Sequence, residues 1–437
     1  MTRPGGHWQN WARTERVRPQ AVEYPTTIEA VRRAVRAAAG RGQRIKAVGS
    51  GHSFTGIAVA PGVLLELTGL SGLVAVDRER AQVRLLAGTK LHRIPALLAP
   101  YGLAMANLGD IDRQSIAGAI STGTHGTGLA YGGIATQLVG AALVTADGEL
   151  LRVDADNNPE LLPAVALGLS ALGILVEVTV QCVPAFALAA VERPEPLDAV
   201  VAGFTERTAR EDHFEFYWFP HTDVALTKTN TRFPADTPTA PLSRTTKFVD
   251  DILVGNVVHQ AVCSAGRVAP PLVPAINRLS TKVWGDRSFS DASARVFATA
   301  RGVRFREMEY AVPLERLGEA FCAIRDLIDE RGWRVEFPIE VRAAAGDDLW
   351  MSTAHGRDSC YIAVHRYWKA PHEEYFAAIE QIMLSFDGRP HWGKMHTLDA
   401  ASLRPRYPRF DDFVALRDRL DPERMFTNAY LTRVLGE

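Results

Sequence analysis

Apolar residues near the start of the chain recur at helical spacing. From Ile28 to Ala38 they return every three or four residues, which places them on one face of an α-helix. Thr26 and Glu29 have the spacing of a capping box, and Gly40 follows the last apolar position. The pattern predicts an amphipathic helix that begins near Thr26 and ends at Gly40.

Short runs of apolar and β-branched residues, bounded by polar or glycine-containing turns, come next along the chain. This pattern is typical of β-strands. A helix is expected from about Leu91 to Tyr101, and Ala146-Asp147-Gly148 predicts a hairpin turn. The predicted strands cover residues 44–48, 63–67, 73–77, 82–87, 138–145 and 149–153.

The segment from Leu161 to Val176 carries no charged residue and is the most membrane-like part of the chain. It is shorter than the ~18 residues that a membrane-spanning helix requires, and it contains Pro163, Gly168 and Gly173. It runs directly into an alternating apolar and polar sequence. We therefore expect a buried helix that leads into a strand.

Longer predicted strands alternate with helices in the second half of the chain. The strands cover residues 213–219, 305–312 and 361–368, the helices cover 314–331, 372–384 and 410–420, and a Pro/Thr-rich surface loop covers 233–243. This change to longer predicted strands follows Pro184 and predicts an α+β fold of two domains. We expect the domains to be residues 1–184 and 185–400, with a C-terminal segment, residues 401–437.

Composition narrows the classes of function. The 437 residues include 49 Lys and Arg against 50 Asp and Glu, which argues against a nucleic-acid-binding protein. The N-terminus lacks the apolar core of a secretory signal, so a cytoplasmic protein is expected. The 12 histidines show no metal-binding motif, so no metal is expected. The cysteines are interpreted as buried thiols: Cys182, Cys263, Cys322 and Cys360.

The stretch Val48-Gly49-Ser50-Gly51-His52-Ser53 follows a predicted strand. Glycines let a ligand approach the backbone closely, and N–H groups at a strand end can form an anion site. The glycine spacing is not that of a Rossmann fingerprint, and such a loop alone is more often a tight turn. A second loop of small and hydroxylated residues, Ser121 to Gly128, changes this interpretation. Two such loops could wrap one dinucleotide.

The strand from Phe337 to Arg342 carries a carboxylate and a guanidinium. With a period of two, Glu340 and Arg342 lie on one face and the apolar residues on the other. The pattern alone favours an exposed ion pair, whereas the apolar flanks favour a buried pair that needs a ligand or partner. His365 lies on a similar strand, and Lys394 follows a glycine. Neither of these two residues has a specific signal of its own.

The two glycine-containing loops, together with His391-Trp392-Gly393-Lys394, resemble the vanillyl-alcohol oxidase superfamily of flavoproteins. Within it the chain is most similar to the sugar-1,4-lactone oxidases and dehydrogenases and their alditol oxidase relatives. The resemblance implies a two-domain FAD-binding fold whose substrate domain, the cap, is built on a mostly antiparallel sheet. It also implies FAD linked covalently through His52.

The resemblance carries roles onto matching positions. Glu340, Arg342 and Lys394 are expected around the substrate hydroxyls and the flavin ring, with His365 lining the pocket. Asp110 lies where alditol oxidase has a serine and is expected to contact substrate, and Gly109 lies beside the flavin's reactive edge. The expected cofactor-binding residues are Val48, Gly49, Ser50, Gly51, His52, Ser53, Ser115, Gly118, Ser121, Thr122, Gly123, Thr124, His125, Gly173, Ile174 and Asn428.

The expected reaction is oxidation of L-gulono-1,4-lactone or D-arabinono-1,4-lactone at C2, with hydride transfer to the flavin. An alditol oxidase acting on a primary alcohol of a polyol such as xylitol or sorbitol is the alternative. A flavin-binding protein without catalytic activity is a third hypothesis, from another class. The electron acceptor is expected to be O2 or a cytochrome- or quinone-type acceptor, with no nucleic-acid partner and no integral membrane association.

Overall fold

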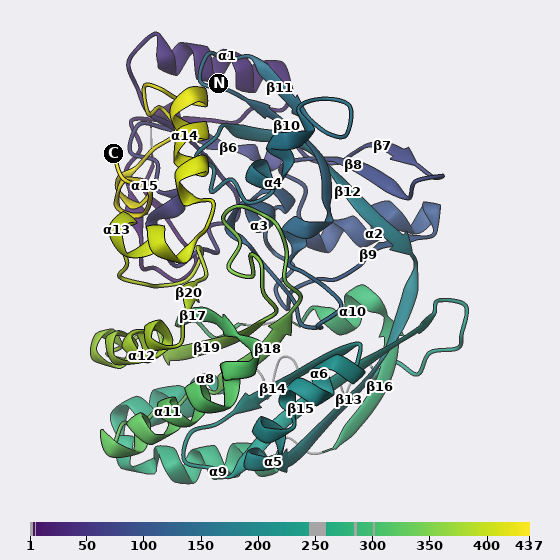
Figure 1. The fold of residues 1–437 in the computed structure, drawn as a ribbon, viewed down its shortest axis with the longest axis vertical. Helices are drawn as coiled ribbons and strands as arrows, with labels where there is room; N and C mark the ends of the chain where they lie inside the picture. Colours follow the sequence, from purple (N-terminus) through teal and green to yellow (C-terminus); the bar gives the residue numbers. More distant parts are fainter. Residues whose placement is uncertain (1–2, 5, 244–258, 284–285, 300–301) are drawn as a thin grey trace.

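Two lobes, each built on its own sheets, make up the molecule (Figure 1). This computed structural model describes residues 3–4, 6–243, 259–283, 286–299 and 302–437. The N-terminal elements and the C-terminal helices form the upper lobe in Figure 1, and the middle of the chain forms the lower one. The α+β fold class is confirmed.

The upper lobe contains a small sheet that is largely parallel and a larger antiparallel one. The order of the first is β1-β4-β6-β5, in which β4, β6 and β5 run parallel. The second has the order β11-β10-β12-β8-β7, with β9 paired to β12. The strands are β1 (Arg3–Pro4), β2 (Trp8–Gln9), β3 (Arg16–Val17), β4 (Ala21–Glu23), β5 (Ile45–Val48), β6 (Val63–Glu66), β7 (Leu73–Asp77), β8 (Gln82–Leu86), β9 (Leu103–Met105), β10 (Leu138–Val144), β11 (Leu150–Val153) and β12 (Ile174–Pro184). The helices are α1 (Ile28–Ala39), α2 (Ile94–Leu98), α3 (Ile116–Thr122) and α4 (Leu162–Val165).

The lower lobe is an eight-stranded antiparallel sheet of order β16-β13-β15-β14-β18-β19-β17-β20. Helices α5, α6, α11 and α12 pack their apolar residues on one face of it. The strands are β13 (Phe186–Pro196), β14 (His213–Trp218), β15 (Val224–Pro234), β16 (Arg287–Ala292), β17 (Phe305–Pro313), β18 (Ile339–Ala344), β19 (Ser359–Tyr367) and β20 (Arg389–Pro390). The helices are α5 (Leu197–Ala202), α6 (Phe204–Arg210), α8 (His259–Val268), α9 (Val273–Val283), α10 (Ser293–Phe297), α11 (Leu317–Glu330) and α12 (Glu373–Ser385).

Alternation along the central strands gives this sheet two different faces. In β18, Ile339, Val341 and Ala343 belong to the apolar core beneath the helices. The intervening Glu340 and Arg342 point to the opposite face, as period two requires. Both are 7% exposed, which agrees with the buried pair that the apolar flanks favour and excludes the exposed ion pair that the pattern alone favours. The other lobe covers this face, which sequence alternation cannot reveal.

The chain passes between the lobes at Pro184, where β12 ends, and β13 begins at Phe186. The last segment leaves the lower lobe as α13 (Ala400–Leu403), α14 (Phe410–Leu420) and α15 (Ala429–Leu435). Phe410, Phe413 and Leu431 share an apolar core with upper-lobe residues such as Ile116. The C-terminal helices therefore pack on the upper lobe.

Several predicted elements need correction. The N-cap of α1 is Thr27, whose hydroxyl accepts from Ala30 N, and not Thr26. The helix expected from 91 to 101 is divided into three short helical pieces. The buried helix expected at 161–176 is only the four-residue α4, because Leu169 and Ser170 adopt left-handed backbone conformations.

The burial of the cysteines agrees with the sequence only in part. Cys182 and Cys360 are buried, but Cys322 is only half-buried, and the Cys263 side chain lies outside the described residues. Among the helices of the described ranges, none has the length and apolar character needed to cross a bilayer.

Candidate active site

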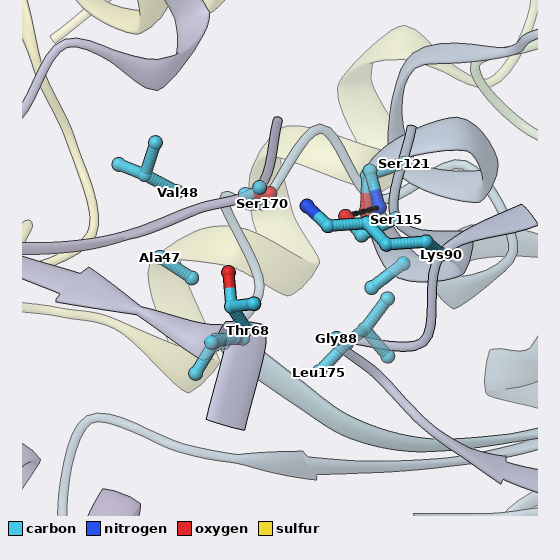
Figure 2. Close-up of a pocket in the computed structure, with 14 residues that line it drawn as sticks. Ala47, Val48, Thr68, Gly88, Lys90, Ser115, Ser121, Ser170 and Leu175 are labelled. Carbon is cyan, nitrogen blue, oxygen red and sulfur yellow. Dashed lines mark hydrogen bonds between the residues drawn. The ribbon is translucent and has the colours of Figure 1, made fainter. Parts of the chain in front are cut away.

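A cavity lies where β5, α3 and the segment before β12 meet. We call it the glycine-lined cavity, because Gly49, Gly88, Gly118 and Gly173 contribute to its wall. A Cβ at Gly118 would lie 3.1 Å from Ser115 Oγ, so the wall has little room for larger residues. Figure 2 shows the Lys90 and Thr68 side chains directed into this space. Hydroxyls, small residues and one ammonium make a wall suited to an anionic, elongated ligand.

A second cavity lies against the charged face of the lower sheet. We call it the charged cavity. The upper lobe supplies loop residues to its wall, and β17, β18 and β19 supply ionisable side chains from below. All four predicted catalytic residues, Glu340, Arg342, His365 and Lys394, line it. Asp110 and Gly109 also line it.

Arg342 is the centre of one charge network on this face. Its Nη2 lies 2.6 Å from Asp110 Oδ1 and also contacts Glu340, while its Nε lies 2.8 Å from Glu215 Oε2. Burial opposes the charge, but these carboxylates outweigh it and hold the pKa of Arg342 well above its ordinary value. Tyr217 donates its hydroxyl to Glu340 at 2.9 Å. Arg342 is thus a fixed cation that orients Glu340 and Asp110.

Lys394 is the centre of a second network. Its ammonium contacts Glu307 and lies 3.9 Å from Glu309 Oε2. Burial would lower the pKa of Lys394, but these two carboxylates raise it above its ordinary value. Burial likewise opposes ionisation of Glu307, yet Lys394 and then His365 lower the pKa of that carboxyl. Lys394 is therefore a stable cation at the cavity wall.

Two histidines complete this second network. His365 places Nε2 3.4 Å from Glu307 Oε1, and its Nδ1 is 2.9 Å from the Pro338 carbonyl. His125 places Nε2 3.2 Å from Glu309 Oε1, and its ring stacks on Tyr361 with centroids 3.7 Å apart. Each buried carboxylate of β17 thus has an imidazole partner from another element.

Backbone contacts bring the predicted sequence motifs together. Phe54 N donates to Gly393 O at 2.7 Å, and Thr55 Oγ1 donates to Trp392 O at 3.1 Å. The loop that carries His52 is therefore tied to the loop that carries Lys394. The His52 ring stacks on Trp11, and burial, followed by Lys90 and Lys394, lowers its pKa to about 4. His52 is therefore a neutral imidazole at neutral pH.

The predicted cofactor-binding residues divide between the two cavities. Val48, Gly49, Ser115, Gly118, Ser121 and Gly173 line the glycine-lined cavity, and His52, Ser53, Thr122, Thr124 and His125 line the charged one. Ser50 accepts a hydrogen bond from Lys90 at 2.7 Å, while Gly51 and Gly123 supply left-handed turns. Ile174 and Asn428 line neither cavity. Asn428 instead caps α15 and donates to the carbonyl of Gly56.

Sequence reasoning missed the partners of the predicted catalytic residues. Glu307 and Glu309 alternate with apolar residues along β17, and Glu215 and Tyr217 do the same along β14. This alternation is the signal that could have found them, because it is the same signal that singled out Glu340. His391, whose pKa burial lowers to about 4, was noted only as part of a motif.

Three groups of ionisable residues in this region have candidate ligand atoms within 4.8 Å of one another. Each group includes a carboxylate that already contacts Arg342 or Lys394. These cations supply the positive charge that a metal ion would otherwise bring. The absence of a metal stays a prediction.

Comparison with known proteins identifies the family. Residues 178–434 match the model for D-arabinono-1,4-lactone oxidase, and residues 19–154 match an FAD binding domain. The chain belongs to the D-arabinono-1,4-lactone oxidase family. It is 43% identical to L-gulono-1,4-lactone dehydrogenase of Mycobacterium tuberculosis over 98% of this chain and 99% of that protein. It is 34% identical to L-gulonolactone oxidase of Scyliorhinus torazame and 30% identical to alditol oxidase of Streptomyces sp., each over 98% of both chains.

The fold has a solved counterpart. A solvent-stable cholesterol oxidase superposes with a TM-score of 0.82 at 19% identity, over 99% of this chain and 98% of that one. This likeness concerns the fold alone and confirms the expected FAD-binding architecture.

The residues present suit FAD, the cofactor of this family's oxidoreductases. Gly49, Gly88 and Gly118 leave a narrow cradle beside Lys90, whose charge matches a pyrophosphate. The charged cavity holds two fixed cations, Arg342 and Lys394, where negative charge would develop on a reduced ring. The lining of the glycine-lined cavity thus fits the phosphate-bearing part of FAD, and the lining of the charged cavity fits the ring.

Proposed function

We propose that this protein is an FAD-dependent oxidoreductase that oxidises a sugar-1,4-lactone of the L-gulono or D-arabinono type at C2. The observation that carries the proposal is the charge balance of the site. Arg342 and Lys394 face the carboxylates Asp110, Glu215, Glu307, Glu309 and Glu340. Lys228 of β15 adds a third cation, with its Nζ 3.5 Å from Glu215 Oε1. Carboxylates accept hydrogen bonds from hydroxyls and repel anions. The site therefore favours a neutral, polyhydroxylated substrate over an aldonate or a sugar phosphate.

The residues of the charged cavity have complementary roles in this proposal. The flavin, when bound, supplies a hydride acceptor. Glu340 accepts a hydrogen bond from the C2 hydroxyl of the substrate and is available to take its proton, while Arg342 and Tyr217 keep its carboxylate in place. Lys394 and Arg342 provide fixed positive charge beside the buried Glu340. His365 orients the Glu307 carboxylate beside Lys394.

We also propose that His52 carries the flavin covalently. A neutral imidazole has a free lone pair, and the lowered pKa of His52 keeps it available at neutral pH. Denatured wild-type protein should retain a yellow, fluorescent band that His52→Ala lacks. Flavin released from the wild-type protein by acid would contradict the linkage.

Expected loss of reduction after Glu340→Ala, Arg342→Ala or Lys394→Ala is about a hundredfold, the scale for one preorganised electrostatic group.

The substrate assignment is tested by anaerobic flavin bleaching. L-gulono-1,4-lactone and D-arabinono-1,4-lactone should bleach the flavin, and their hydrolysed aldonates should not, although each pair shares a carbon skeleton. The aldonates are the matched control, because they differ from the lactones in charge and ring closure. Faster bleaching by xylitol or sorbitol would instead support the alditol oxidase alternative. Absence of bleaching by any of these compounds would support a binding protein without catalytic activity.

The electron acceptor belongs to the same proposal. O2 and a cytochrome- or quinone-type acceptor are the two candidates, and Gly109 lines the cavity that either one would have to serve. Reoxidation of the lactone-reduced protein with each acceptor distinguishes an oxidase from a dehydrogenase.

A further inference from the structure

A half-buried arginine and a buried histidine of the lower lobe contact the upper lobe at the segment that follows β9. Arg232 belongs to β15, and His213 is the first residue of β14, the neighbouring strand (Figure 1). The segment is Ala106–Asp110, which supplies Gly109 and Asp110 to the charged cavity. Neither Arg232 nor His213 lines that cavity, so any effect of these two residues on the reaction is indirect.

Both lobes hold the first residue of the segment. Ala106 N donates to Gln137 Oε1 at 3.0 Å within the upper lobe. The Ala106 carbonyl accepts from Arg232 Nη2 of the lower lobe. At the other end of the segment, the Asp110 carbonyl accepts from Thr299 N at 3.0 Å. The lower lobe therefore anchors the segment at both of its ends.

Four contacts fix the position of Arg232. Its guanidinium carbon lies 4.0 Å from the centroid of the Tyr131 ring and 4.2 Å from that of the Phe186 ring. Besides the bond to Ala106, Arg232 Nε donates to His213 Nε2 at 3.0 Å. A planar guanidinium can stack between two rings while its N–H groups donate in the plane, which an ammonium cannot do. The site is therefore specific for arginine.

His213 accepts from Arg232 in only one protonation state. Its Nδ1 lies 2.7 Å from the Thr127 carbonyl, to which a ring nitrogen can only donate. The neutral ring then leaves Nε2 free to accept from Arg232, and burial lowers the pKa of His213 to about 4. The same Thr127 carbonyl accepts from Asn107 Nδ2 at 3.2 Å. His213 thus shares an acceptor with a residue of the segment.

Thr127 also connects this joint to the strand that carries Arg342. The Thr127 hydroxyl accepts from Ala343 N at 3.3 Å, and Gly128 N donates to Ala343 O at 2.9 Å. Arg342, the preceding residue of β18, places Nη2 2.6 Å from Asp110 Oδ1. The contacts at Ala106 and the contact at Asp110 are therefore built on the same rigid sheet.

We propose that Arg232 and His213 are positioning residues for the oxidation: they seat Ala106 on the lower lobe and thereby place the Asp110 carboxylate beside Arg342. The proposal rests on the proposed function, because it assigns a role in that same reaction. Close packing makes the segment transmit a shift, since even a Cβ at Gly109 would lie 2.8 Å from the His125 carbonyl oxygen. A misplacement of about 1 Å can slow a reaction about a hundredfold.

The first test measures the anchoring without turnover. In hydrogen exchange of the flavin-loaded protein, Arg232→Met should speed exchange of peptides that cover the Ala106–Asp110 segment about tenfold, as local opening becomes easier. Arg207→Met is the matched control. Arg207 lies 3.9 Å from the centroid of the Phe214 ring and 2.8 Å from Glu195 Oε2, all within the lower lobe. It should leave exchange of the segment unchanged.

The second test is a double-mutant cycle on anaerobic flavin reduction by lactone. Arg232→Met should slow reduction about tenfold or more in the otherwise wild-type protein. In the Asp110→Asn background the same change should slow it by less than about twofold, because the carboxylate that Arg232 positions is already absent. Arg232→Lys, which keeps the charge and can still donate to the Ala106 carbonyl, should recover part of the rate.

Unchanged exchange of the segment in Arg232→Met would overturn the anchoring. Equal slowing of reduction in the wild-type and Asp110→Asn backgrounds would overturn the positioning role, since a loss that does not depend on Asp110 indicates general damage. If polyols and not lactones bleach the flavin, the substrate assignment fails, and the cycle repeated with the polyol still decides whether Arg232 acts through Asp110.

Discussion

Glu307→Gln tests whether the second charge network serves catalysis as well as folding. The substitution keeps the side chain's size and removes one negative charge at a position 4% exposed. It leaves Lys394 with Glu309, whose Oε2 is 3.9 Å away, as its remaining acidic partner in the network. Removing one partner of a buried pair costs about 3–5 kcal/mol, because the other charge stays buried. Since Glu309 remains and the Lys394 side chain is 20% exposed, we expect about 2–3 kcal/mol.

The catalytic effect should be distinct from the loss of stability. In the Glu307→Gln variant, Lys394 loses the interaction that raises its pKa most, so the pKa of Lys394 should fall. The rate of flavin reduction in the Glu307→Gln variant should then decline as pH rises above neutrality. The wild-type rate should not decline over the same pH range. Stopped-flow reduction by lactone between pH 6 and 9, with urea unfolding of the same samples, measures both effects.

An exposed pair offers the control. Glu319 accepts from Arg316 at 3.0 Å on the surface of α11, and its side chain is 65% exposed. Glu319→Gln should change stability by less than about 0.5 kcal/mol and leave reduction unchanged. The reasoning would be refuted if Glu307→Gln behaved like Glu319→Gln, with neither a loss of stability nor a new pH dependence.

Two other predictions concern backbone packing and acid stability. Gly109→Ala places a Cβ 2.8 Å from the His125 carbonyl oxygen, so it should destabilise the protein by about 1–3 kcal/mol. The same variant should react more slowly with both O2 and an acceptor dye. Gly318→Ala is the control and should not destabilise, because its Cβ meets nothing within 4 Å. Thermal melts and reoxidation rates check this pair, and a selective loss of O2 reactivity would contradict it. Burial lowers the pKa of His213 to about 4, so the unfolded chain binds more protons than the folded protein between pH 6.5 and 4. The free energy of unfolding should therefore fall by up to about 3 kcal/mol as pH drops through that window. Urea unfolding at pH 7 and 4.5 should show a smaller loss for His213→Asn, and an equal loss would exclude His213 as the cause.

The sequence supported the fold class and the pairing of Glu340 with Arg342 for a physical reason. Alternation along a strand is a local property, so it correctly put both residues on one face of β18. It could not show which face would be covered, because coverage depends on the other lobe. The same limit hid Glu307 and Glu215, which contact Lys394 and Arg342 across strands far apart in sequence.

Local signals failed where backbone geometry overrode composition. Residues 161–176 are apolar enough for a helix, yet Gly168 and the left-handed Leu169 and Ser170 turn the chain after α4. Lys46 uses this turn: its buried ammonium donates to Ser170 O at 3.1 Å and to Phe426 O at 2.9 Å. The contacts of Lys46, which link β5 to this turn and to the C-terminal segment, therefore favour the turn over a longer helix. Helix propensity depends on local sequence alone, so it does not include such tertiary contacts.

The central strands of the lower sheet supply the core and the active site from alternate residues. Met308 and Val341 pack beneath the helices, while their neighbours Glu307, Glu340 and Arg342 enter the charged cavity. Burying so many charges costs free energy, which the networks around Arg342 and Lys394 offset only while their spacing is kept. A rigid sheet keeps that spacing, since moving one carboxylate would displace the core residues on either side of it. The arrangement therefore places the electrostatic groups on the least deformable part of the lobe and leaves substrate and cofactor contacts to the loops above it.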